Sequence, residues 1–344
     1  MAANLRIGLV GYGVGGRVFH APIIDAAEGC ELSAILARSA ERQAEAKSDY
    51  PAIPVVTRMS AMAEYVDAVV ISTPLWTHAE LAREALKLGL PCIIDKPFGT
   101  NAQEARAVLE EAEAKKIPLM VYQNRRWDAD YLTLKKVIAS GELGALWLFE
   151  SRMEELSPPG GVPASGGGVL IDFGSHVFDQ TLQLFGPAKT VYAEVHPIQG
   201  REPLEDRFFA IIHHESGMRS HLTGDLNLQG EASPRFRLTG TKGTFTIPPH
   251  DGMANILRSG GRKASHAPTW AKVPEEAWGK IERPGYSQII PSENAGWTDL
   301  YEGFARAVRG EGRLPVDPWD SLKALELIDA AKESVLTHQV RSLL

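Results

Sequence analysis

The sequence predicts a two-domain α/β protein, and three observations support this fold class. The chain has 344 residues, which is more than one hydrophobic core usually serves. Up to Tyr122, short apolar runs alternate with helical patterns, as in βαβ units that build a parallel sheet. After Arg125, longer β-patterned segments follow at hairpin-like spacing, which is typical of a mostly antiparallel sheet. We therefore expect an N-terminal α/β domain over residues 1–123 and a C-terminal α+β domain with an open sheet over residues 124–344.

The elements of each domain can be assigned from the apolar periodicity. The strands expected in the N-terminal domain are Arg6–Val10, Glu31–Ala37, Ala68–Ser72, Pro91–Asp95 and Leu119–Tyr122, with helices that include Thr77–Leu88 and Asn101–Lys115. The C-terminal domain is expected to hold helices over Asp128–Ser140, Leu170–Phe185, Trp297–Arg309 and Pro318–Thr337. Its expected strands are Leu146–Glu154, Thr190–His196, Phe208–His214, Arg219–Leu228, Phe236–Thr239 and Gly243–Ile247. The stretch Pro248–Ala295, rich in Pro, Gly and Ser, is expected to leave the sheet as a long excursion.

The composition excludes several classes of protein. Hydrophobic residues make up 44% and charged residues 23%, the balance of an ordinary soluble globular chain. A net charge of −7 argues against a general nucleic-acid surface. No apolar run is long enough to span a bilayer, and the N-terminus lacks the pattern of a signal peptide. Cys30 and Cys92 lack metal-type spacing and fit two buried thiols, which suit a reducing cytoplasm. Taken together, the composition and charge lead us to expect a cytoplasmic protein without nucleic-acid or membrane partners.

A glycine-rich turn directly follows the first expected strand. Gly11-Tyr12-Gly13-Val14-Gly15-Gly16 matches the pattern GxGxxG. Gly11 allows the tight turn, Gly13 lets the backbone approach a pyrophosphate, and Gly16 lets the helix pack against the strand. The helix N-terminus offers N–H groups to the phosphates. The alternative is an ordinary glycine loop, but the βα context favours a Rossmann dinucleotide-binding domain.

The end of the second strand distinguishes NADP from NAD. An NAD site usually has Asp or Glu there, about 20 residues beyond the turn, to bind the ribose hydroxyls. Here the chain reads Ala37-Arg38-Ser39, so no carboxylate would repel a 2′-phosphate. Arg38 can bind that phosphate through two N–H groups, and Ser39 can donate a hydrogen bond. NADP is therefore expected over NAD, the alternative being that Arg38 is a surface residue at the start of the next helix.

Three further motifs resemble a known family. They are Ser72-Thr73-Pro74, Asp95-Lys96-Pro97-Phe98 and the segment from Gly166 to His176, GGGVLIDFGSH. With the glycine turn, they resemble the glucose–fructose oxidoreductase/inositol dehydrogenase family over nearly the whole chain. The resemblance implies that Lys96, Asp172 and His176 form the catalytic set and also touch the substrate. For the cofactor it implies a site made of Gly11, Tyr12, Gly13, Val14, Gly16, Arg38, Ser39, Thr73, Pro74, His78, Asp95, Lys96, Asn124 and Arg125.

The residue types of the catalytic set suit alcohol oxidation. If Asp172 and His176 lie on a helix, their four-residue spacing places them on one face, in a polar stripe that continues to Asp179 and Gln183. The alternative is that this stripe is a solvated surface. His176, with an ordinary pKa of about 6.5, can accept the hydroxyl proton. An ammonium at Lys96 would keep that imidazole neutral and stabilise the alkoxide, while Asp172 would orient the substrate. The nicotinamide accepts the hydride, so no metal is required.

A narrower resemblance points to the NADP-linked scyllo-inositol dehydrogenase subgroup. It rests on Phe19-His20-Ala21-Pro22 and on Asn124-Arg125-Arg126-Trp127-Asp128. The resemblance implies that the Asn124–Trp127 stretch lies beside the nicotinamide and that Trp127 contacts the substrate. For Arg126 we favour a salt bridge at the domain interface, and Trp127 could equally be a packing residue. Asp95 replaces the commoner glutamate. The segment Arg152–Ser165 lacks the Trp-Arg pair that the subgroup often has there.

The leading hypothesis is therefore an NADP-dependent oxidoreductase that reversibly converts a secondary alcohol of a cyclic polyol or sugar to a ketone. Alternatives on the same scaffold are an aldose 1-dehydrogenase, a deoxysugar-ketone reductase and a glycosidase that retains NAD. A regulator that senses dinucleotide without chemistry is another, against which the presence of Lys96, Asp172 and His176 speaks. Because relatives associate through one face of the antiparallel sheet, the resemblance implies a homo-oligomer, a dimer or a tetramer. Two other polar clusters, His213-His214 on one strand and the basic loop Arg258–Lys263, are not expected to form sites.

Overall fold

The computed structural model describes residues 3–156, 167–198, 204–260 and 270–343, which form two compact units. The first unit comprises the described residues of Met1–Trp127, Gly252–Ala271 and Gly296–Leu322. The second comprises those of Asp128–Asp251, Lys272–Ala295 and Lys323–Leu344. Each unit is therefore assembled from separate parts of the sequence. In the described residues, no helix is both long and apolar enough to cross a membrane.

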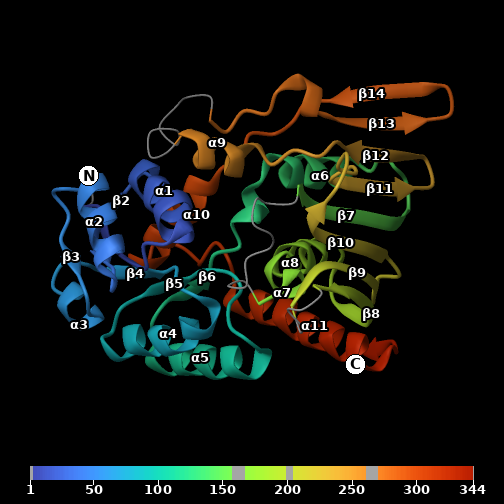
Figure 1. Cartoon of the computed structure of the whole chain (residues 1–344). Coiled ribbons are helices and arrows are strands. Elements are labelled where there is room, and N and C mark those ends of the chain that lie inside the picture. The colour runs from blue at the N-terminus through green and yellow to red at the C-terminus, as the bar shows by residue number, and fades with distance from the viewer. Residues whose placement is uncertain (1–2, 157–166, 199–203, 261–269, 344) are drawn as a thin grey trace. The chain divides into compact units, whose positions relative to one another are not determined.

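The first unit is built on a parallel sheet of six strands (Figure 1). The strands are β1 (Leu5–Val10), β2 (Cys30–Leu36), β3 (Val55–Val56), β4 (Ala68–Ile71), β5 (Cys92–Ile94) and β6 (Leu119–Val121). Their spatial order is β3-β2-β1-β4-β5-β6. The chain order reverses between β1 and β4, which is where doubly wound sheets bind ligands. All side chains of β4 and β5 are buried, as expected when helices cover both faces of a parallel sheet.

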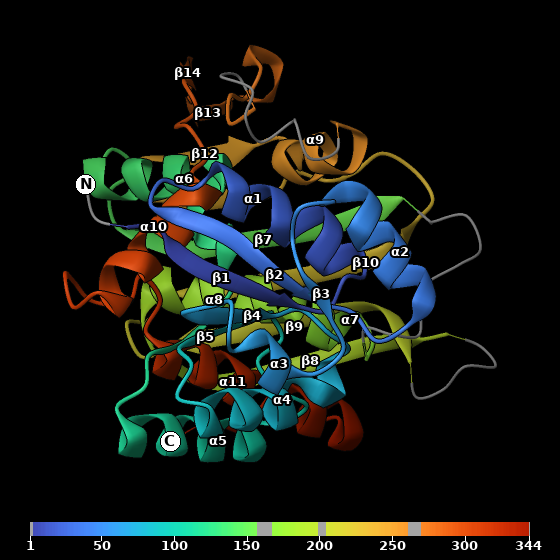
Figure 2. The same cartoon turned by 90° about the vertical axis from the view of Figure 1, so that its left-hand side faces the viewer.

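Helices lie on both faces of this sheet. They are η1 (Gly15–His20, π-helical), α1 (Ala21–Ala26), α2 (Ala40–Asp49), α3 (Met59–Met62), α4 (His78–Lys87), α5 (Ala102–Lys115), α9 (Gly252–Gly260) and α10 (Trp297–Val308), with short 3₁₀ segments η2 (Leu75–Thr77) and η3 (Asn124–Trp127). In both views, α1 and α10 cover one face and α4 and α5 the other (Figures 1 and 2). Asn101 starts α5 because its side-chain oxygen accepts the N–H of Glu104 at 2.9 Å.

The second unit is built on a sheet of nine strands. They are β7 (Leu146–Leu156), β8 (Ala188–Pro197), β9 (Glu205–His214), β10 (Arg219–Leu228), β11 (Phe236–Gly240), β12 (Gly243–Ile247), β13 (Gly279–Arg283), β14 (Tyr286–Ile290) and β15 (Arg341–Ser342). The order is β14-β13-β12-β11-β7-β10-β9-β8-β15, and only β7 and β10 pair in parallel. Both sheets confirm the predicted fold class.

One face of the nine-stranded sheet is covered by helices. These are α6 (Ala129–Ser140), α7 (Val169–Asp172), α8 (Gly174–Phe185) and the part of α11 (Pro318–Thr337) from Lys323 onward (Figure 1). A 3₁₀ turn, η6 (Glu275–Ala277), precedes β13. Alternate side chains of the central strands, such as Phe149, Leu222 and Ile212, are fully buried under the helices. The sheet therefore has one buried face and one face that, in the described chain, carries no helix.

The expectation of a long excursion over Pro248–Ala295 is wrong. β13 and β14 form a hairpin that extends the sheet beyond β12, and α9 belongs to the first unit. The sequence conceals the hairpin because its alternation is mostly polar, with only Gly279 and Ile281 buried on β13. The single helix expected over Leu170–Phe185 is interrupted at Phe173, between α7 and α8.

Candidate active site

The predicted cofactor residues of the first unit follow the carboxyl ends of neighbouring strands. The last residues of these strands pair in one row: Leu36, Val10, Ile71, Ile94 and Val121. The loops that follow this row carry Arg38, Gly11, Thr73, Asp95 and Asn124. Parallel pairing in register therefore brings five separate sequence motifs to one edge of the sheet.

The glycine turn has the shape that a pyrophosphate needs. Gly11 has φ +99°, and a Cβ there would lie 2.1 Å from the carbonyl oxygen of Ser72. A Cβ on Gly16 would lie 2.2 Å from the Gly11 oxygen, so only glycine lets the helix approach the strand. A Cβ on Gly13 would meet nothing within 4 Å, which leaves its backbone open to a ligand. The neighbouring Val14 is 65% exposed. This cradle fits a dinucleotide phosphate.

Gly15 is a further closely packed glycine, whose contacts the sequence does not reveal. A Cβ there would lie 2.6 Å from Ser72 Oγ and 3.2 Å from Asp95 Oδ2. The turn therefore packs directly against the side chains that end β4 and follow β5. The pattern GxGxxG leaves this position unspecified, and only the packing reveals its constraint.

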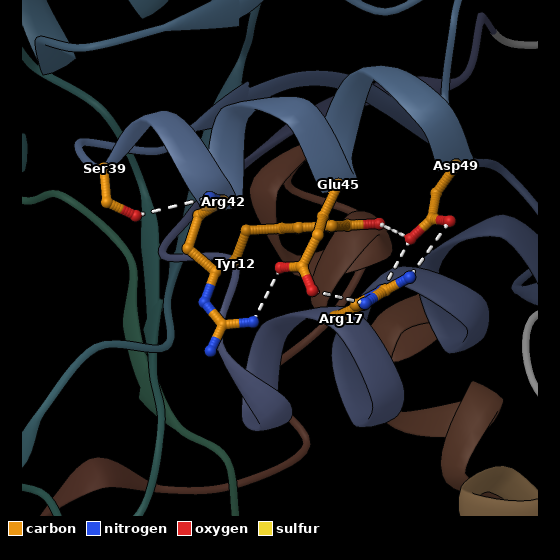
Figure 3. Close-up of polar contacts among 6 residues, drawn as sticks. All are labelled: Tyr12, Arg17, Ser39, Arg42, Glu45 and Asp49. Carbon is orange, nitrogen blue, oxygen red and sulfur yellow. Dashed lines mark hydrogen bonds and ion pairs between the residues drawn. The ribbon is translucent and has the colours of Figure 1, made fainter.

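A polar network ties the glycine turn to α2 (Figure 3). The hydroxyl of Tyr12 donates to Asp49 Oδ2 at 2.9 Å, and Arg17 contacts the same oxygen at 2.7 Å. Glu45 accepts from Arg17 at 2.7 Å and from Arg42 at 2.6 Å. Tyr12 is only 2% exposed. Because the Tyr12 side chain is buried against α2, the cofactor contact expected at Tyr12 can be made only by its backbone.

Arg38 and Ser39 are exposed at the start of α2. Ser39 Oγ accepts the N–H of Arg42 at 3.3 Å and so caps the helix, as serine commonly does. Arg42 brings a second guanidinium to the same turn. Arg42 was not among the predicted cofactor residues, although it lies only three residues after Ser39, in the first turn of α2. No carboxylate lies between the end of β2 and Ser39.

Asp95 fixes the backbone before Lys96. Its Oδ1 accepts the N–H of Lys96 at 2.8 Å. Its Oδ2 accepts from Ser72 Oγ at 2.9 Å and lies 3.1 Å from His20 Nε2. Burial acts to raise the pKa of the Asp95 carboxyl, but His20, His78 and Lys96 outweigh it and bring that pKa to about 2. Asp95 is therefore ionised near neutral pH, and Lys96 follows it on a half-buried turn.

The His78 side chain, expected to contact the cofactor, contacts backbone carbonyl groups instead. It is 1% exposed, with Nδ1 2.8 Å from the Pro97 oxygen and Nε2 2.8 Å from the Thr73 oxygen. Both ring nitrogens thus contact backbone, and His78 can serve a cofactor only through the loops that it joins. Thr73 is half-buried and Pro74 exposed at the start of η2. The Lys96-Pro97 bond is cis.

The Asn-Arg-Arg-Trp motif forms η3 after β6. Asn124 is 7% exposed, and Arg125 and Trp127 are half-buried. Arg126 forms an ion pair with Asp320 at 4.0 Å. Both residues belong to the first unit, so the salt bridge favoured for Arg126 exists within one unit rather than at a domain interface.

Asp172 and His176 belong to the second unit. Asp172 ends α7 and is half-buried, whereas His176 is 5% exposed in the first turn of α8. Phe173 keeps right-handed helical angles, so the two residues remain about one turn apart. Asp179 is 1% exposed, and only Gln183 of the predicted stripe is exposed. The solvated-surface alternative is therefore wrong for His176 and Asp179.

A buried glutamate holds the start of α7. Glu205 Oε1 accepts the N–H of Leu170 at 3.0 Å, and Glu205 is 8% exposed. A Cβ on Gly168, which has φ +93°, would lie 2.2 Å from that oxygen. Burial raises the pKa of the Glu205 carboxyl, although the N–H of Leu170 acts to lower it. Gly168 of the GGGVLIDFGSH motif therefore admits this contact because it has no side chain. Gly166 and most of the Arg152–Ser165 segment lie outside the described residues.

The two histidines of β9 and the two cysteines are exposed or buried as predicted. His213 is exposed and His214 is 2% exposed, so they face opposite sides of β9. Cys30 and Cys92 are free and buried. Among the described residues, no group of His, Cys, Asp and Glu could hold a metal ion. Of the loop Arg258–Lys263, the structure describes only Arg258–Gly260, which end α9.

Comparison with known families decides the classification. The family model described as "Oxidoreductase family, NAD-binding Rossmann fold" matches residues 5–123, and the model described as "GFO/IDH/MocA C-terminal domain" matches residues 131–246. The chain belongs to the GFO/IDH/MocA family. The predicted resemblance is thereby confirmed. As a member of this family of oxidoreductases, the protein is an NAD(P)-dependent dehydrogenase.

Relatives within the GFO/IDH/MocA family match over almost the full length. The chain is 30% identical over 344 residues to scyllo-inositol 2-dehydrogenase (NADP(+)) IolW of Bacillus subtilis, covering 96% of this chain and 94% of that one. It is 30% identical to the oxidoreductase YdgJ of Escherichia coli, covering 97% of both chains. A crystal structure from Klebsiella pneumoniae superposes with a TM-score of 0.89 at 30% identity, covering 99% of this chain and 96% of that one.

Proposed function

We propose that this protein is an NADP-dependent dehydrogenase that reversibly oxidises a secondary alcohol of a cyclic polyol or sugar. The observation that carries the proposal is the presence of Lys96, Asp172 and His176 at the family's motif positions, with His176 buried on a helix. A buried imidazole one turn from a carboxylate is suited to proton transfer rather than to a solvated surface. The similarity to a scyllo-inositol dehydrogenase supports a polyol substrate.

The preference for NADP is supported by the start of α2. Arg38, Ser39 and Arg42 offer two guanidinium groups and a hydroxyl at the end of β2, where an NAD site usually has a carboxylate. A 2′-phosphate binds well to such a set because arginine N–H groups match phosphate oxygens. Glu45 lies nearby, but it is engaged by Arg17 and Arg42 (Figure 3).

In the proposed mechanism, each residue of the catalytic set has one task. A bound nicotinamide would supply the hydride acceptor. His176 accepts the hydroxyl proton of the substrate and returns it in the reverse direction. The Lys96 ammonium stabilises the negative charge that develops on the alcohol oxygen. Asp172 accepts a hydrogen bond from a second substrate hydroxyl and so orients the ring.

The decisive experiment is a substrate panel of inositols, aldoses and ketoses, each assayed with NADP and with NAD by nicotinamide absorbance. We expect NADP-linked turnover with at least one cyclic polyol or sugar. Activity on aldoses alone would favour the aldose 1-dehydrogenase, and reduction of deoxysugar ketones alone the reductase. Glycoside cleavage without net consumption of added cofactor would favour the glycosidase. Absence of turnover with every compound would favour the dinucleotide-sensing regulator.

A further inference from the structure

Two buried histidines of the first unit lie on either side of Lys96 and have no role in the proposed mechanism. His20 is 0% exposed and ends η1, directly after the glycine turn. His78 is 1% exposed and begins α4. A histidine buried to this degree is shielded from water, so the groups that its ring nitrogens face indicate its task.

His20 connects α10 to the carboxylate that precedes Lys96. Its Nδ1 lies 2.5 Å from the hydroxyl of Tyr301, and its Nε2 lies 3.1 Å from Asp95 Oδ2. The ring also packs against Tyr122, with ring centroids 4.2 Å apart. The other oxygen of Asp95 accepts the N–H of Lys96 at 2.8 Å. Any rotation of the Asp95 carboxylate would therefore disturb the Lys96 peptide.

The protonation of Asp95 and Tyr301 limits which atoms can donate in this chain of contacts. Asp95 is ionised at neutral pH, because its pKa is about 2, so it can only accept hydrogen bonds. Any hydrogen on His20 Nε2 would therefore be attracted to Asp95 Oδ2, which lies 3.1 Å away. Burial raises the pKa of Tyr301 well above its usual range, so its hydroxyl stays protonated and can donate to Nδ1. Close contacts therefore run from Tyr301 through His20 to Asp95.

His78 holds the other side of the same turn. Its two ring nitrogens lie 2.8 Å from the carbonyl oxygens of Pro97 and Thr73. Carbonyl oxygens only accept, so both hydrogen bonds form together when both ring nitrogens carry hydrogen. His78 thus joins the loop after β4 to the loop after β5.

We propose that His20 and His78 are positioning residues for Lys96 and together form a histidine clamp. His20 fixes the Asp95 carboxylate and through it the N–H of Lys96. His78 fixes the carbonyl of Pro97. The Lys96 side chain then projects from a backbone that is held on both sides, which keeps its ammonium in place for the reaction. The catalytic consequence rests on the proposed function, but the hydrogen bonds do not.

The clamp can be tested by hydrogen exchange of the Lys96 amide in the full-length protein. His20→Leu removes the ring nitrogen that lies 3.1 Å from Asp95 Oδ2, and we expect exchange to become about 10-fold faster or more, because the carboxylate that accepts the Lys96 N–H is then less firmly held. His20→Gln can still donate an amide N–H to Asp95, so we expect it to restore protection to within about threefold. His214→Leu is the matched control, because His214 is equally buried but lies in the second unit. We expect it to leave Lys96 exchange unchanged.

Kinetics distinguish positioning from a purely structural role. In His20→Leu we expect kcat per folded molecule to fall about 10-fold, while KM and the NADPH dissociation constant change less than about threefold. His20→Gln should recover most of the kcat. A structural role alone would lower the melting temperature and leave kcat per folded molecule unchanged, which would overturn the proposal.

The tautomer of His20 gives a test that needs no variant. We expect the ¹⁵N chemical shifts of the wild-type ring to report hydrogen on Nε2, the nitrogen that faces Asp95. Hydrogen on Nδ1 alone would contradict the clamp, as would unchanged Lys96 exchange in folded His20→Leu. If no alcohol is turned over, the proposed function fails, but amide exchange and the tautomer still decide the clamp.

Discussion

At the residue scale, the candidate site depends on side chains whose chemistry can be predicted and on contacts that cannot. Lys96, Asp172 and His176 stand out in the sequence because they lie in recognisable motifs. Gly15 and His20 also lie in motifs, but the motifs do not reveal their contacts, because both residues meet the Asp95 carboxylate, which lies more than seventy positions away in the chain. Only a folded parallel sheet brings these residues together.

The proposed preference for NADP is tested at this scale by Arg38. We expect Arg38→Ala to raise the NADPH dissociation constant about 10-fold or more, because it removes a charge-assisted contact to the 2′-phosphate. NADH affinity should change less than about threefold. Titration of cofactor fluorescence measures both constants, with Arg313→Ala, an exposed arginine of the same unit, as the control. An equal loss for both cofactors would contradict the assignment.

At the element scale, boundaries that depend on local signals are predictable and those that depend on tertiary contacts are not. Gly141, at φ +69°, ends α6 as its sequence indicates. The break between α7 and α8 differs from the predicted single helix, although Gly174, a weak helix former, directly follows Phe173. The hairpin of β13 and β14 was missed because a polar edge hairpin lacks the apolar alternation of a central strand.

The start of α7 gives a prediction with a defined pH dependence. The pKa of Glu205 is higher in the folded protein than its unfolded value of about 4.3, so ionisation of Glu205 costs stability. That cost is absent below the unfolded pKa and complete above the folded one. Glu205→Gln keeps an oxygen for the N–H of Leu170 without the charge. We expect its melting temperature to exceed that of wild type by about 2 °C at pH 8 and the gain to vanish near pH 4. A gain that is equal at both pH values would show that the charge of Glu205 is not the cause.

At the scale of the whole molecule, the order of the elements was predictable, but their grouping was not. The sequence predicts a division after residue 123, whereas the compact units interleave, with α9 and α10 in the first and β13 and β14 in the second. Sequence patterns report which residues are buried but not against which sheet, so the return of the chain to the first unit could not be foreseen.

The open face of the nine-stranded sheet carries the proposed oligomer contact. Phe209 and Ile211 are half-buried and alternate with buried Phe208, Ala210 and Ile212, so they lie on the face opposite the helices. We propose that this face mediates a homodimer or tetramer of the 37.5 kDa chain. Light scattering after gel filtration should give twice or four times the chain mass, and Phe209→Lys should reduce it. Leu336→Lys, at an apolar residue of α11 that is 80% exposed, is the control and should leave the mass unchanged. A wild-type mass equal to one chain would contradict the proposal.

The central claim, that Lys96 and His176 carry out the chemistry on an NADP-linked alcohol, is tested most directly by steady-state turnover of Lys96→Met and His176→Ala. The substrate is the best one from the panel, and NADPH binding is measured on the same samples. We expect each variant to lose about 100-fold or more of kcat, the usual contribution of acid–base or charge-stabilising groups, with NADPH affinity within about threefold of wild type. Turnover near the wild-type rate in either folded variant would contradict the assignment.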